Sequence, residues 1–221
     1  MNMKQILLML MVVTALVSCQ DKKPAVLDTA GKNATIETIL TRRSIRKYTE
    51  QQVTNDQLDT IMKCAIYSPS ALNKQSWEIR VVKNPKLLEE INNRYLAVAR
   101  AQLASGVELK GSAARAANPG FSVFHGAPTL IVLAQDTANS YSSVDMGILT
   151  ENILLSAKAL GLGTCPIGSL VPTFRDPSNV DLLEPLHFSD GYRVGLTIAL
   201  GYPAEDPQPK ERYADKVKII E

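Results

Sequence analysis

The stretch Ser68-Pro69-Ser70-Ala71-Leu72-Asn73-Lys74-Gln75-Ser76-Trp77 separates a predicted helix from a predicted strand. The helix starts at Thr54, which stands in a capping-box relation to Gln57 and precedes apolar residues at helical spacing. The strand covers residues 77–82, which alternate in part before a turn at Asn84-Pro85. The stretch is therefore a loop that carries Ser, Asn and Pro between two packed elements.

Two basic segments lie far from this loop in the sequence. Arg42-Arg43-Ser44-Ile45-Arg46 follows a short predicted helix, and Pro209-Lys210-Glu211-Arg212 lies near the C-terminus. Guanidinium, hydroxyl and ammonium groups are the donors that suit a phosphate. Each segment alone also fits a solvated surface loop, because short basic runs are common. Their joint order with the Ser68–Trp77 loop favours a site for an anionic cofactor.

A glycine-rich turn, Gly161-Leu162-Gly163-Thr164-Cys165-Pro166-Ile167-Gly168, lies between the loop and the second basic segment. It is not the dinucleotide fingerprint, because Pro166 occupies a position where that motif requires glycine. Its glycines instead predict a backbone that passes close to a flat group, since a missing side chain permits such an approach.

Hydrophobic periodicity predicts the remaining elements. The helices are expected at 34–42, 87–103 and 143–160. The strands are expected at 128–134, where a continuous apolar run predicts a central position, and at 192–200. Residues 106–126 lack periodicity, which is typical of a lid or of a surface loop.

The order of these segments resembles the nitroreductase family of FMN-dependent oxidoreductases, over about residues 34–221. The family shows Arg-x-Ser-x-Arg/Lys, then Pro-Ser-x-x-Asn-x-Gln-x-Trp, then a glycine-rich turn, and finally Pro-x-Lys-x-Arg. The resemblance implies an α+β fold with three α/β/α layers, in which helices flank a mixed, mainly antiparallel sheet. It also implies a homodimer that exchanges C-terminal tails, with Val217 and Ile219 in an alternating pattern suited to an added strand.

The resemblance also implies which residues bind FMN. The phosphate ligands would be Arg42, Arg43, Ser44, Arg46, Lys210 and Arg212. The loop residues Pro69, Ser70, Ala71 and Asn73 would reach the flavin from the other subunit, and the backbone of Pro166, Ile167 and Gly168 would face the ring. Some members carry an acidic residue where this chain has Gly168, so a role that depends on that carboxylate does not transfer. Phe121 and Phe124 are candidates for stacking over a substrate, with core packing as the alternative.

In such an enzyme NADH or NADPH reduces the flavin at N5, and a small acceptor such as a nitroaromatic or a quinone then oxidises it in a ping-pong cycle. The cofactor carries the chemistry, so no catalytic acid or base is expected. His125 and His187 are expected to be structural, and no metal-ligand cluster stands out. The alternatives are a dehalogenase or flavin-cleaving enzyme of the same fold, a flavin-binding electron carrier without turnover, and an interaction protein that has lost FMN.

Composition supports one globular domain. The chain has 221 residues, of which 45% are hydrophobic and 21% charged, and its net charge is +2. This length suits one substantial core. The nearly balanced charge, without clustering of basic residues and aromatics, argues against nucleic-acid binding.

The N-terminus predicts export. Residues 1–19 place one lysine before an apolar run of about 12 residues, which suits a signal peptide and is too short for a membrane span. Leu16-Val17-Ser18-Cys19 resembles a bacterial lipobox, so Cys19 is the expected lipidation site and the envelope membrane the expected location. An ordinary signal peptide is the alternative. Residues 20–33 are expected to be a linker and 34–221 the domain. Cys64 and Cys165 are expected to be buried small hydrophobes, and an exported compartment also permits a disulfide between them.

Overall fold

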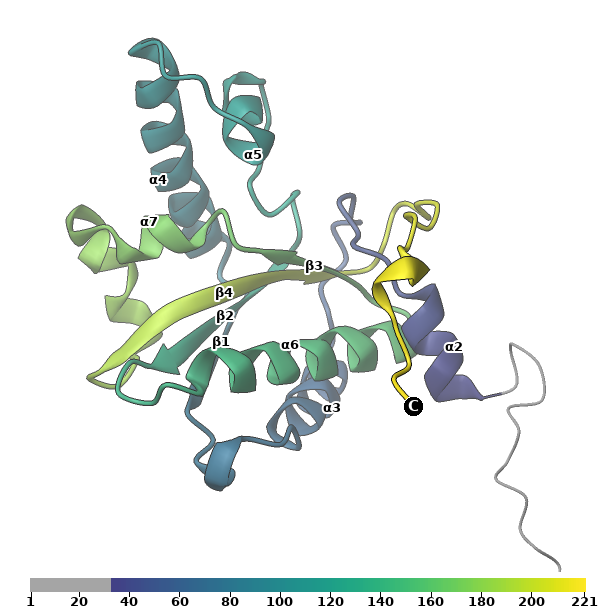
Figure 1. The fold of residues 1–221 in the computed structure, drawn as a ribbon. Coiled ribbons are helices and arrows are strands. Elements are labelled where there is room, and N and C mark those ends of the chain that lie inside the picture. Colours follow the sequence, from purple (N-terminus) through teal and green to yellow (C-terminus); the bar gives the residue numbers. More distant parts are fainter. Residues whose placement is uncertain (1–32) are drawn as a thin grey trace, which may run out of the picture. The chain divides into compact units, whose positions relative to one another are not determined.

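The computed structural model describes residues 33–221. The predicted signal peptide, Cys19 and all of the predicted linker except its last residue lie outside the described residues. The compact unit runs from Thr38 to Glu221 and contains the sheet, its helices and the tail. Helix α2 (Ala34–Thr41) leads into it (Figure 1).

Four strands form one sheet in the order β1-β2-β4-β3: β1 (Trp77–Val82), β2 (Thr129–Asp136), β3 (Gly163–Ile167) and β4 (Tyr192–Gly201). All three ladders are antiparallel, with Val81 opposite Ile131 and Cys165 opposite Ala199. Among the described residues, parallel pairing is confined to a bridge between Ser44 and Thr164. The predicted α+β class and mainly antiparallel sheet are confirmed, and β2 is central as its apolar run predicts.

Helices cover both faces of the sheet, which makes three layers (Figure 1). Helices α3 (Asn55–Ile66) and α6 (Ser142–Ala159) pack against one face together with Ile131 and Leu133. Helices α4 (Pro85–Ala104) and α7 (Val171–Arg175) pack against the other, together with Leu130 and Val132. Successive residues of a strand point to opposite faces, so the fully buried β2 supplies both cores.

Local signals explain where the long helices begin. Thr54 caps α3 and forms the complete capping box with Gln57, as predicted. Asn84 caps α4 by accepting the backbone N–H groups of Lys86 and Leu87, and Pro85 occupies the first turn, where its missing N–H has no cost.

Short helices fill the connections. They are η1 (Ala71–Asn73), α5 (Gly111–Ala114), η2 (Arg115–Ala117), η3 (Pro177–Leu182), η4 (Glu184–Leu186) and η5 (Ala214–Lys216). The irregular segment 106–126 thus holds α5 and η2. In the tail, Val217, Ile219 and Ile220 are exposed and belong to no strand of the described chain. Within residues 33–221 no helix has the length and apolarity that a membrane crossing requires.

Candidate functional site

The first basic segment is attached to the free edge of β3. Ile45 donates its backbone N–H to the Thr164 carbonyl at 2.9 Å, next to the Ser44–Thr164 bridge. Tyr48 donates its hydroxyl to the Ile45 carbonyl at 2.8 Å. The segment then pairs with the end of β4, where Thr49 donates to the Tyr202 carbonyl at 3.0 Å. The structure therefore brings together the predicted basic segment and the predicted glycine-rich turn.

The glycine-rich turn is a strand, and its glycines have three different functions. Gly161 has φ +75° and ends α6 in a left-handed conformation. A Cβ on Gly163 would lie 2.8 Å from Cγ1 of Ile45, so this glycine permits close packing of the basic segment. A Cβ on Gly168 would meet no atom within 4 Å, and the same holds for Gly161. The left-handed turn at Gly161 and the contact with Ile45 at Gly163 give these two glycines local reasons, and the approach of a flat group to this backbone stays a prediction.

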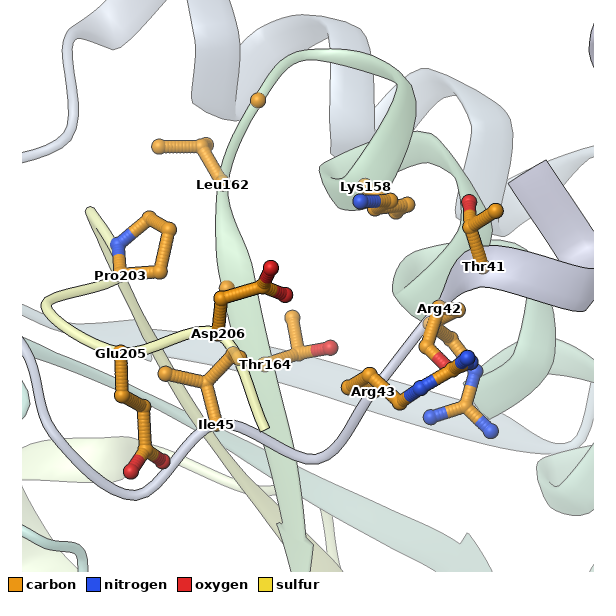
Figure 2. A pocket seen from close by; sticks show the side chains of 12 residues that line it. Thr41, Arg42, Arg43, Ile45, Lys158, Leu162, Thr164, Pro203, Glu205 and Asp206 are labelled. Carbon is orange, nitrogen blue, oxygen red and sulfur yellow. The ribbon is translucent and has the colours of Figure 1, made fainter. Parts of the chain in front are cut away.

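A cavity of about 330 Å³ lies where the basic segment, β3 and the start of the C-terminal tail meet. Figure 2 shows Thr41, Arg42 and Arg43 on one side and Leu162, Pro203 and Glu205 on the opposite side. The lining residues are Thr41, Arg42, Arg43, Ile45, Lys158, Gly161, Leu162, Gly163, Thr164, Pro203, Glu205 and Asp206. We call this space the basic-edge cavity.

Arg42 has the chemistry of an anion ligand. Its Nε is buried without a hydrogen-bond partner among the described residues, and Oε1 of the half-exposed Glu151 lies 3.7 Å away. A buried guanidinium N–H that lacks an acceptor is costly, so its presence favours an acceptor that enters from outside the chain. Arg43 instead donates to the backbone carbonyls of Leu40 and Arg42, both at 2.8 Å.

Arg46 lies beside the basic-edge cavity and does not line it. Its guanidinium donates to the Ser44 carbonyl at 3.2 Å, and its backbone N–H donates to the Glu205 carboxylate. Glu205 thereby fastens the start of the C-terminal tail to the basic segment, together with a 2.9 Å bond from Ala204 N–H to the Lys47 carbonyl.

The second basic segment does not reach the basic-edge cavity. Lys210 and Arg212 are exposed, and within residues 33–221 the Arg212 guanidinium donates to the carbonyls of Lys210 and Glu211. The chain that precedes them, Pro203 to Asp206, does line the cavity. The structure thus joins the first basic segment to the root of the tail and leaves the two tail cations in solvent.

The predicted flavin-facing loop is at the other end of α6. Ala71 donates its backbone N–H to Oδ1 of Asp145, in the first turn of α6, at 3.0 Å. Lys158, in the last turn of α6, lines the basic-edge cavity. At 1.5 Å per residue, these two positions are about 20 Å apart along the helix axis. Within one chain, Pro69, Ser70, Ala71 and Asn73 therefore do not join the basic-edge cavity.

A side-chain hydrogen bond holds the end of β3. Ile167 is buried, and its carbonyl accepts a hydrogen bond from the Thr197 hydroxyl at 2.9 Å, while Pro166 is half-buried and Gly168 exposed. The Thr197 bond fixes the direction of this strand end.

The two predicted substrate-stacking residues differ in exposure. Phe124 is buried in the core against α4, which favours the core alternative. Phe121 is half-buried, and the Arg115 guanidinium lies 5.4 Å from its ring centroid. Nearby, burial and then the charges of Arg46 and Arg115 lower the pKa of His125 below its ordinary value. Phe121 stays a prediction as a substrate contact.

Neither of the two cysteines in the described chain lines the basic-edge cavity. Cys64 and Cys165 are free. Cys165 is buried, and burial raises the pKa of its thiol, while Cys64 is half-buried. Within residues 33–221 there is no group of His, Cys, Asp and Glu that could hold a metal ion.

Sequence reasoning missed several residues of this region. Thr41, Lys158, Thr164, Glu205 and Asp206 line the cavity, and Asp145 holds the loop. The signals for Lys158 and Asp145 were their places in the last and first turns of the strongest predicted helix. Glu205 and Asp206 had no signal, because their position depends on a pairing between residues more than 150 positions apart.

Comparison with known proteins agrees with this architecture. A model of the nitroreductase family matches residues 39–202. An NADPH-flavin oxidoreductase of Vibrio harveyi is 30% identical over 194 residues, which cover 86% of this chain and 74% of that protein. A nitroreductase with bound FMN from Desulfitobacterium hafniense is 30% identical, covers 86% of this chain and 100% of that one, and has a TM-score of 0.78. An FMN-dependent nitroreductase from Clostridium difficile is 34% identical with the same coverages and a TM-score of 0.72.

These similarities define an enzyme of the oxidoreductase class. The chain belongs to the nitroreductase family.

Proposed function

We propose that this chain binds FMN and passes reducing equivalents from NADH or NADPH through the flavin N5 to a nitroaromatic, a quinone or a similar small acceptor, in a ping-pong cycle. FMN supplies the hydride chemistry when bound, and the protein supplies binding and orientation. The observation that carries the proposal is Arg42: this residue lines the basic-edge cavity, and its buried Nε has no hydrogen-bond partner among the described residues, with the Glu151 carboxylate 3.7 Å away.

The residues present fit the phosphate and the flavin ring of FMN. Arg42 has an unused donor, Ser44 is next to β3, and Gly168 leaves space at the strand end. A partly buried phosphate needs charge-assisted hydrogen bonds, which a guanidinium fork supplies in pairs. Lys210 and Arg212 follow the tail residues of the cavity and add two cations once the tail folds over the ligand.

We propose that the active form is a homodimer with two shared sites. The Pro69–Asn73 loop and the basic-edge cavity lie at opposite ends of α6, so a second chain is needed to bring such a loop to the same flavin. The ends of α3 and α6 also expose large apolar side chains, which mark association surfaces. They are Ile66, Tyr67, Leu72, Tyr141, Val144 and Ile148. The exposed Val217 and Ile219 in the tail suit an exchange with the unpaired edge of β1.

The visible spectrum of the protein tests the cofactor and the electron donor. Purified protein that starts after Cys19 should show flavin bands after addition of FMN, and these bands should bleach under anaerobic titration with NADH or NADPH. Absence of FMN binding would contradict the proposed function. Bound flavin that neither nucleotide bleaches would favour the electron-carrier alternative, and turnover with iodinated or brominated phenols would favour a dehalogenase.

The N-terminal segment supports a second proposal, that Cys19 is lipidated and anchors the enzyme to the bacterial envelope. Expression of the full chain and of a Cys19→Ala variant tests it. The first should partition with membranes and have a lipid-sized mass increase at the mature N-terminus, whereas the variant should lack both. Equal partition of the two would contradict the anchor.

A further inference from the structure

Asp145 is a buried carboxylate that the proposed chemistry does not use. It lies in the first turn of α6 with 3% of its surface exposed. Its Oδ1 accepts the Ala71 N–H, and its Oδ2 is buried without a hydrogen-bond partner among the described residues. The positive end of the helix dipole offsets part of the cost of this charge. A half-satisfied buried carboxylate is still a poor way to stabilise a fold, because an apolar side chain costs less.

The loop that Asp145 holds is conformationally strained. Leu72, Asn73 and Gln75 have φ values of 54°, 54° and 49°, in the left-handed region that leucine and glutamine rarely occupy. Such conformations persist only where surrounding contacts over-determine them, and they gather at functional sites. Here the contacts include a 3.0 Å bond from Gln75 N–H to the Ser70 hydroxyl and the bond from Ala71 to Asp145.

Among the described residues, Asp145 gives the strained Pro69–Asn73 part of the loop its hydrogen bond from outside. The end of the loop is held separately at Ser76, whose carbonyl accepts the Asp136 N–H at 3.2 Å and whose hydroxyl accepts the Asn139 side-chain amide at 2.7 Å. The bond from Gln75 to Ser70 closes the loop on itself, whereas Asp145 is 74 residues away from Ala71 in the chain. It therefore fixes the position of the strained turn relative to α6, which the turn's own bonds cannot do. Leu72 and Asn73 are exposed, so little packing holds these two residues once the Asp145 bond is lost, whereas the buried Ser76 keeps its own bonds to Asp136 and Asn139.

We propose that Asp145 is a positioning residue for the flavin site: its Oδ1 holds the Ala71 amide so that the strained Pro69–Asn73 turn is preformed where it meets the cofactor. This inference rests on the proposed function, since it assigns the loop to the flavin. It predicts that loss of the acceptor at Oδ1 loosens the loop first and alters the bound flavin as a consequence.

Two substitutions distinguish the loss of the hydrogen-bond acceptor at Oδ1 from a general loss of stability. Asp145→Asn keeps an oxygen at the Oδ1 position, whereas Asp145→Ala removes it. Thr150→Val is the matched control, because it deletes a buried 2.8 Å bond from the Thr150 hydroxyl to the Met146 carbonyl in the same helix without contact to the loop. A hydrogen bond to a charged group corresponds to about a tenfold to hundredfold change in an equilibrium.

The experiment combines hydrogen exchange of the loop amides with the reduction potential and visible circular dichroism of the FMN-saturated protein. In Asp145→Ala we expect exchange at residues 69–76 to accelerate at least about tenfold, the FMN Kd to rise about tenfold, and the potential and dichroism to change. Asp145→Asn should stay within about threefold of wild type in exchange and Kd. Thr150→Val should lower the Tm without these changes.

Two results would overturn the inference. One is unchanged exchange and unchanged flavin potential in Asp145→Ala. The other is an equal effect of Asp145→Asn and Asp145→Ala, which would mean that the charge and not the acceptor matters. If Asp145→Ala does not fold, Asp145→Asn decides the question against wild type and Thr150→Val. Exchange at residues 69–76 within about threefold of wild type supports the inference, and an acceleration of about tenfold or more, with an oxygen still at the Oδ1 position, overturns it. Failure of the proposed function looks different, because wild type itself would then bind no FMN while loop exchange still responds to Asp145→Ala.

Discussion

At the scale of single residues, Arg42 shows how a buried polar atom can indicate a binding site. Its guanidinium is mostly buried, lines the basic-edge cavity and leaves Nε without an acceptor in the described chain. The sequence pattern predicted the phosphate role for Arg42. It could not predict that the guanidinium of the neighbouring Arg43 donates hydrogen bonds to two backbone carbonyls. Adjacent arginines differ here because backbone geometry directs them to different acceptors.

Arg42→Gln should weaken FMN binding about tenfold to hundredfold, which is the effect of losing a charge-assisted hydrogen bond. Fluorescence titration with FMN measures the change. Riboflavin lacks the phosphate, so its affinity should be the same in the variant and in wild type. Arg193→Gln removes the same charge from an exposed position and should leave both affinities unchanged. An equal loss for riboflavin and FMN would show that Arg42 does not contact the phosphate.

His125 predicts a pH dependence of stability. Burial, Arg46 and Arg115 lower its pKa in the folded state, so the unfolded chain binds a proton more readily. Above the ordinary histidine pKa, His125 is neutral in both the folded and the unfolded chain and costs no stability. As the pH drops below about 6.5, the unfolded chain takes up the proton first, so the free energy of unfolding should fall. His125→Asn should reduce this fall in urea unfolding between about pH 7 and pH 5.

His187→Asn is the control for this pH series. Both histidines have left-handed φ values, 62° and 47°, and asparagine tolerates that conformation better than most residues. The control should thus have a similar backbone effect and leave the acid-side slope in place. An identical slope in wild type and His125→Asn would contradict the prediction.

At the scale of elements, the helices and strands that could be predicted are those with signals in their own local sequence. The capping box at Thr54, the apolar run of β2 and the stop at Gly161 are local, and α3, β2 and α6 appeared where predicted. Strand β3 was missed because its pairing with β4 joins residues 30 to 38 positions apart and its glycines suggested a turn. The segment from α7 to η4 was missed because its helices are one or two turns long and interrupted by proline.

Gly163→Ala should separate the basic segment from β3. The added Cβ would lie 2.8 Å from Ile45, so one of the two backbones must move, at a cost of about 1–3 kcal/mol. Urea unfolding measures the loss of stability, and FMN titration should show weaker binding. In the double variant Gly163→Ala/Ile45→Ala the loss should be smaller than the sum of the single losses, because two of the crowded atoms are gone. Additive losses would mean that this contact is not the cause.

At the scale of the whole molecule, the proposed homodimer requires a second copy of the chain to complete each site. No sequence pattern reports the distance between the Pro69–Asn73 loop and the basic-edge cavity, since that distance depends on the length and placement of α6. The motifs alone indicated the basic segment and the polar loop as candidates for one site. Their division between two ends of one helix became visible only in three dimensions.

Val144→Glu should convert the dimer to a monomer and weaken FMN binding at the same time. The side chain of Val144 is 62% exposed on α6 among other exposed apolar residues, where a charge would be buried by a partner. Sedimentation equilibrium measures the mass, and FMN titration measures the site. Val180→Glu is matched in exposure, at 60% on η3, and should remain dimeric with normal affinity. A monomeric Val144→Glu protein with undiminished FMN affinity would show that the site needs only one chain.

The two ends of α6 have a consequence for communication between sites. In the proposed dimer each α6 would hold its own chain's cofactor with its last turn and the partner's cofactor with its first. The same rigid helix then contributes residues to both cofactor pockets, so a shift of α6 when FMN binds at one end also moves the residues at its other end. Loading of the first FMN should therefore change the affinity for the second, and the Hill coefficient of an FMN titration should differ from one.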